Sequence, residues 1–176
     1  MSTPSTHWTY KLLKGITPVV FIGLCIKTGS LLFSVFVSLF VNPQASKNLY
    51  MGLDLSALMN YDMVHYTFTV MMLLLLSGLK AWMALDLVKI LSDLNMEQPF
   101  SDRVYRLILR ITRKAAITGL LALVALKHSE WLVCQAVSLP LEWAAPEILL
   151  FAAVLMVIAQ VFRRGIDLQQ EQSLTV

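Results

Sequence analysis

Charged residues are scarce in this sequence. Asp, Glu, Lys and Arg together make up 14% of its 176 residues, whereas hydrophobic residues make up 57% and the mean hydropathy is +0.70. Soluble domains carry about 25% charged residues, and a chain of this size could not hide so much apolar surface from water. The composition therefore excludes soluble enzymes, DNA-binding modules and disordered regulators, and it indicates a membrane protein.

Cysteine and glycine are also few. The two cysteines, Cys25 and Cys134, cannot form a disulfide framework. The seven glycines make no Gly-x-Gly-x-x-Gly or P-loop pattern, and the chain has no His-Glu-x-x-His, Cys-x-x-Cys or Gly-x-Ser-x-Gly motif. We therefore expect no catalytic residue, no metal site and no cofactor, and we expect that the chain is not an enzyme.

Four apolar segments predict an all-α, polytopic membrane protein that forms a single domain over residues 1–176. Asn42 and Pro43 should end the first helix, and Pro146 suits the first turn of the fourth. The expected transmembrane helices are 15–41, 63–87, 107–130 and 146–163.

The third of these segments has the weakest signal. Its uninterrupted apolar run, 115–126, is shorter than the roughly 20 residues that cross a bilayer. Either Arg110 and its basic neighbours extend to the inner surface, or Lys127 and Glu130 enter the outer leaflet, or the helix tilts.

The distribution of basic residues predicts the orientation. Two of the fourteen Lys and Arg precede the first helix, six lie between residues 85 and 115, and two follow the fourth helix. By the positive-inside rule, both termini, the loop 88–113 and the tail 164–176 are cytoplasmic.

Lys27 is expected close to the middle of the first membrane helix, where an unpaired ammonium costs at least about 2.5 kcal/mol. We expect its side chain to face the bundle interior. It would serve there as a proton relay or an internal polar site, or it would simply bond to neighbours such as Thr28 and Ser30.

Polar residues gather at the predicted outer face: His65, Lys127, His128 and Glu130. They could form a sensor for a ligand or for protons, or only a hydrated surface. His65 and His128 are also the one pair that could hold a b-type haem between two helices.

An arginine stripe marks the cytoplasmic loop. Ser101 and Asp102 suit a helix start, and Arg103, Arg106, Arg110 and Arg113 follow at helical spacing. Apolar residues on the adjoining stripe make this segment an amphipathic helix that lies on the inner surface or leads into the third membrane helix. Lipid headgroups or a soluble partner would bind the arginines.

Pro99 and Phe100, the Arg-rich helix after them and the ending 165–176 resemble the bacterial family of four-helix membrane proteins grouped as a domain of unknown function, DUF2975. The resemblance implies the bacterial inner (cytoplasmic) membrane. It also implies a small Cro/C1-type helix-turn-helix regulator as partner, which the protein would bind and sequester.

The chain itself shows no element that reads nucleic acid, and homo-oligomerisation stays open. Two rival hypotheses are a b-haem or quinone-linked redox membrane protein and a small transporter or its accessory subunit. The residues expected to bind the partner are Pro99, Phe100, Arg103, Arg106, Arg110, Ile166, Leu168, Leu174 and Val176.

Overall fold

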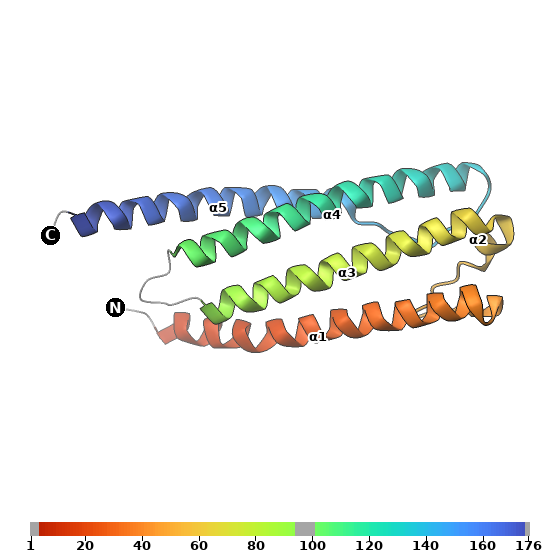
Figure 1. Cartoon of the computed structure of the whole chain (residues 1–176), viewed down its shortest axis with the longest axis horizontal. Helices are drawn as coiled ribbons and strands as arrows, with labels where there is room; N and C mark the ends of the chain where they lie inside the picture. The colour runs from red at the N-terminus through yellow and green to blue at the C-terminus, as the bar shows by residue number, and fades with distance from the viewer. Residues whose placement is uncertain (1–3, 94–100, 175–176) are drawn as a thin grey trace.

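The computed structural model describes residues 4–93 and 101–174, and these residues form helices and short connections. The long helices run in alternating directions (Figure 1), joined by a 3₁₀ helix, a short α-helix and loops. The elements are α1 (Pro4–Phe40), a 3₁₀ helix (Pro43–Lys47), α2 (Ser56–Tyr61), α3 (Met63–Asp93), α4 (Asp102–Cys134) and α5 (Ala145–Leu174).

The four long helices lie in chain order, each beside the next. α1 packs against α3, α3 against α4, and α4 against α5, as Figure 1 shows. Among the described residues, α1 packs against neither α4 nor α5. The fold is therefore an open row of helices. We call the end at which α3 ends and α4 begins the basic end, because Lys89, Arg103, Arg106 and Arg110 lie there.

Local signals set several helix ends. The Ser101 side chain accepts a hydrogen bond from the Val104 N–H and caps α4, whose first residue is Asp102, as predicted. The Asn42 side chain caps the 3₁₀ helix that Pro43 begins after α1, and Pro146 stands in the first turn of α5. These three predictions are confirmed.

Other helix bounds differ from those expected. α1 begins at Pro4, α3 continues to Asp93, and α4 is one continuous helix from Asp102. The arginine stripe therefore leads directly into the next long helix and is not a separate surface helix. α5 also continues through the expected tail to Leu174: Gly165 follows Arg164 but does not end the helix, and no proline follows it.

Hydroxyl groups join α1 to α3 at three levels. The Tyr10 hydroxyl donates to the Leu91 carbonyl (2.7 Å), Thr28 bonds to Ser77 (2.8 Å), and Ser38 bonds to Tyr66 (2.6 Å). Such bonds between apolar helices satisfy polar groups that have few other partners and fix the helix register.

Small residues line the contact between α4 and α5. On α5 the buried residues Ala145, Ala152, Ala159 and Ile166 recur every seven positions, the period of a left-handed helix pair. On α4, Gly119 faces Leu149, and a Cβ atom built on this glycine would lie 2.7 Å from Leu149 Cγ. Glycine and alanine thus let the two backbones approach closely.

α5 begins halfway along α4. Leu149 lies beside Gly119, near the middle of α4, which continues to Cys134. The loop 135–144 runs back from the end of α4 toward the middle of that helix. It is held there by the Trp143 indole N–H, which donates to the Ser129 hydroxyl (2.7 Å). α5 and the rest of α4 are consequently offset along their common axis (Figure 1).

Three helical segments of the described chain are long and apolar enough to cross a membrane: Tyr10–Phe40, Met63–Asp93 and Ala145–Glu171. α4 is not among them. The fold is all-α and suits a membrane protein, in agreement with the coarse prediction from composition.

Candidate functional site

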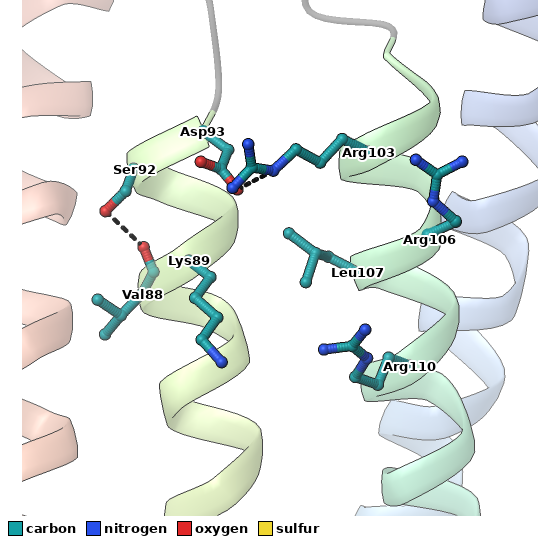
Figure 2. Close-up of a pocket in the computed structure, with 8 residues that line it drawn as sticks. All are labelled: Val88, Lys89, Ser92, Asp93, Arg103, Arg106, Leu107 and Arg110. Atoms are coloured by element: carbon teal, nitrogen blue, oxygen red, sulfur yellow. Dashed lines mark hydrogen bonds and ion pairs between the residues drawn. The ribbon is translucent and has the colours of Figure 1, made fainter.

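A cleft rich in cations lies between α3 and α4 at the basic end. Its volume is about 390 Å³. In Figure 2, Lys89 on α3 and Arg103 and Arg110 on α4 extend across the gap between the two helices. The residues that line this basic cleft are Val88, Lys89, Ser92, Asp93, Arg103, Arg106, Leu107 and Arg110.

The acidic residue of the cleft is already paired. The Asp93 carboxylate lies 2.8 Å from Arg103 Nε, and this ion pair crosses from α3 to α4 (Figure 2). The Arg103 side chain is 73% exposed, so the pair should contribute at most about 1 kcal/mol. It leaves the other three cations of the cleft without a carboxylate in the cleft itself.

A second carboxylate lies behind the cleft. The Asp86 side chain is fully buried and accepts a hydrogen bond from Lys114, whose side chain is 11% exposed. The Lys114 ammonium also lies 3.9 Å from the centroid of the Trp82 ring, a cation–π contact. This buried pair connects α3 to α4 at the base of the cleft, next to Lys89 and Arg110.

The cleft keeps an excess of hydrogen-bond donors. Arg110 Nη1 and Lys89 Nζ lie 3.9 and 4.0 Å from Asp86 Oδ1, which is too far for hydrogen bonds. Arg106 forms no ion pair within the described chain. Four cationic side chains against Asp93 give the lining a formal charge of +3, so the cleft should attract anions.

An apolar groove lies on the other side of the α3–α4 pair. It has a volume of about 420 Å³, is lined by α3, α4 and α5, and has Lys80 as its charged residue. Phe151, Leu155 and Phe162 form its α5 wall. The same two helices thus present a cationic cleft on one side and an apolar groove on the other.

The structure corrects the expected role of Ile166 and of the tail. Ile166 is only 4% exposed, and it continues the buried residues of α5 that recur every seven positions. It therefore packs within the protein and is not available to a partner. Leu168, in contrast, is 60% exposed. Since the tail is helical to Leu174, a partner would meet the side of a helix and not an extended strand.

Of the other expected partner-binding residues, Arg103, Arg106 and Arg110 line the cleft. Arg103 and Arg110 extend toward α3, whereas the Arg106 side chain points away from the gap (Figure 2). Pro99, Phe100 and Val176 lie outside the described residues, as does the side chain of Leu174. Asp86 and Lys89 were missed by sequence reasoning. The sequence did carry a signal: Asp86 is an acidic residue inside an apolar run, and such a residue in a membrane helix implies a cationic partner.

Lys27 does not point into an enclosed interior. Its side chain is exposed and borders a small cavity of about 110 Å³ that Lys80 and Glu142 also line. The Lys27 ammonium lies 5.8 Å from the centroid of the Tyr50 ring. Because the helices form an open row, a residue of α1 has no α4 or α5 to face.

The expected sensor residues meet at the end opposite to the basic end. The rings of His65 and His128 lie 5.3 Å apart between centroids, and the His65 ring also contacts Trp131. Since the two imidazoles lie against each other, no porphyrin plane fits between them in this arrangement. Lys127 and Glu130 form an exposed ion pair of 2.7 Å.

Asp62 immediately precedes α3 and caps the helix close to these rings. Its carboxylate accepts hydrogen bonds from the backbone N–H groups of His65 (3.0 Å) and Val64 (2.7 Å). These bonds stabilise the charged form, the one from His65 most, and lower the pKa of the Asp62 carboxyl below its usual value. Asp62 is thus an anionic helix cap over the physiological pH range.

Comparison with family models, curated proteins and solved structures finds no match to this chain. The resemblance to DUF2975 therefore stays a prediction, and the basic cleft is the feature from which a function can be argued.

Proposed function

We propose that the chain is a four-helix protein of the bacterial inner membrane, with α4 as the fourth crossing helix and the basic end in the cytoplasm. α4 lies between α3 and α5, and its run 115–126 is apolar. Ten of the fourteen Lys and Arg belong to the ends and the connection that share one side. The positive-inside rule supports this orientation.

Reporter fusions test the orientation. Alkaline phosphatase, which is active only outside the cytoplasm, should be inactive when fused after Val176 and active when inserted at Gly52, in the exposed turn between the 3₁₀ helix and α2. A cytoplasmic fluorescent reporter should give the opposite pattern. Phosphatase activity at Val176 would reverse the assignment.

We further propose that the basic end binds a small cytoplasmic helix-turn-helix regulator and sequesters it at the membrane. The observation that carries this proposal is the formal charge of +3 in a cleft whose acid is already paired. An acidic face of a partner would find there guanidinium donors of Arg106 and Arg110 that form no hydrogen bond to a carboxylate of the described chain. Beside the cleft, α5 continues past the start of α4 and exposes Leu168, an apolar contact for the same partner.

Release could follow from movement between two helices. Asp93 and Arg103 join the rim of the cleft, and Asp86 and Lys114 join its base, so both pairs cross from α3 to α4. A shift of α4 relative to α3 would change the spacing of the arginines. Such a shift gives the membrane segment a means to control binding at the cytoplasmic surface.

Capture of a small Cro/C1-type helix-turn-helix regulator, the partner that the resemblance to DUF2975 implies, tests the proposal. Arg103→Glu with Arg106→Glu should weaken capture about tenfold and reduce its dependence on salt, because both cations leave the rim of the cleft. Lys11→Glu with Lys14→Glu is the matched control, since it changes the net charge equally on α1 and should leave capture unchanged.

Removing residues 167–176 tests the tail separately and keeps the buried Ile166 in place. The truncated protein should still insert in the membrane but hold less regulator.

The two pairs of charge reversals, at Arg103 and Arg106 and at Lys11 and Lys14, also have an outcome that would contradict the proposal. If both pairs weaken capture equally, attraction depends only on the net charge and the cleft is not the binding site.

A further inference from the structure

The basic cleft also has the chemistry of a phosphate site. Guanidinium groups bind phosphate oxygens through parallel N–H donors. Arg106 forms no ion pair within the described residues, and Arg110 lies 3.9 Å from Asp86 Oδ1, too far for a hydrogen bond, so both keep donors for a phosphate. Lys89 adds a third cation from the opposite helix. The volume of about 390 Å³ suits a small polar group such as a phosphate.

The surface that continues from the cleft identifies the source of the phosphate. On α4, steps of three and four residues place the cleft arginines on one helix face, and the same steps continue it as apolar residues. Each of these is more than half exposed. The face runs through Arg103, Arg106, Arg110, Arg113, Ile117, Leu120 and Val124.

α3 shows the same change along its facing side. Seven residues before Lys89 lies Trp82, which is 56% exposed, and a further seven residues before that lies Leu75, which is 45% exposed. Tryptophan is typical of the level at which lipid headgroups meet the hydrocarbon. Both walls of the cleft thus pass from cationic to exposed apolar side chains in the same direction.

We propose that the basic cleft binds the phosphate of an anionic phospholipid, whose acyl chains lie along the exposed apolar faces of α3 and α4. A free phosphate or a nucleotide would use the cations but would leave the apolar continuation unexplained. The charge of +3 favours an anionic headgroup, because a choline headgroup would bring its own cation to the arginines. This inference does not depend on the helix-turn-helix regulator.

Native mass spectrometry of the purified full-length protein measures this binding. Phosphatidylglycerol and phosphatidylcholine with identical acyl chains are titrated in separate samples that contain no protein partner. We expect at least about tenfold tighter binding of phosphatidylglycerol. Arg106→Gln with Arg110→Gln should lower that affinity to about the phosphatidylcholine value, whereas Lys11→Gln with Lys14→Gln should not change it.

The single variant Arg106→Gln is the control for a folding defect. Arg106 forms no ion pair within the described residues, whereas Arg110 lies near Asp86 and its replacement could destabilise the protein. It should weaken phosphatidylglycerol binding several-fold with an unchanged melting temperature. Equal binding of the two lipids, or full binding by the double variant, would overturn the proposal. Displacement of phosphatidylglycerol by inorganic phosphate would assign the cleft to a free anion, and displacement by a polyglutamate peptide would assign it to an acidic protein.

Discussion

Replacing Asp86 by leucine is expected to lower the free energy of unfolding by about 3–5 kcal/mol, the loss that follows removal of one partner from a buried ion pair. Asp86 is fully buried, and the Lys114 ammonium that donates to it is held between this carboxylate and the Trp82 ring. Without Asp86 the ammonium would stay buried with only the ring as partner. SDS-induced unfolding in mixed micelles, followed by circular dichroism, measures the loss.

Two further variants separate the charge from the packing. Asp86→Leu with Lys114→Met should regain much of the lost stability, because apolar side chains of similar volume can replace a buried ion pair. Asp93→Asn is the matched control, since it breaks an ion pair between the same two helices whose arginine is exposed, and it should cost at most about 1 kcal/mol. If Asp86→Leu unfolds like the parent, the pair is dispensable for the α3–α4 contact.

The second large effect is expected at Gly119. A Cβ atom there would lie 2.5 and 2.7 Å from two Leu149 side-chain atoms and 3.4 Å from the Leu149 nitrogen, so Gly119→Val should force α5 away from α4. Overpacking of this kind costs about 1–3 kcal/mol. The same unfolding assay measures it.

Gly78→Val is the control, because a Cβ atom at Gly78 in α3 would meet nothing within 4 Å. Gly119→Val with Leu149→Ala should restore stability by making room for the new side chain. An unchanged unfolding midpoint for Gly119→Val would show that the α4–α5 contact is looser than the structure indicates.

Signals that act over a few residues could be predicted from the sequence. Ser101 caps α4 through an N–H three residues later, and Pro146 fits the first turn of α5 because the N–H that it lacks is not needed there. Composition alone predicted long apolar helices. The gathering of Arg103, Arg106 and Arg110 followed from helical spacing.

Contacts between helices could not be predicted in the same way. Whether Lys114 reaches Asp86 depends on how far α3 and α4 slide past each other, and residues 94–100 between them carry no signal that fixes this register. The open row of helices could not be predicted either, because apolar patterns do not indicate which helices pack against each other. Lys27 was expected to face an interior because an ammonium exposed to lipid is costly, but the open row of the described helices leaves α1 without α4 or α5 to enclose it.

The burial of Ile166 did have a signal. Ala145, Ala152 and Ala159 precede it at intervals of seven, but the polar residues around Ile166 suggested a tail outside the helix. A repeat that crosses from an apolar into a polar segment is better evidence for a continuing helix than the mean polarity of that segment.

The offset of α5 has a consequence for the surrounding bilayer. Ala159 packs with Val104 and Ile108, so the exposed residues Val157 and Val161 lie at the level of the cleft arginines. A flat hydrocarbon layer centred on α1 and α3 does not cover the part of α5 around Val157 and Val161. A layer that extends far enough to cover this part of α5 also covers Arg106. One side of the molecule therefore does not match a flat bilayer, and lipids of different chain length should tilt α5 and move the basic end that it shares with α4.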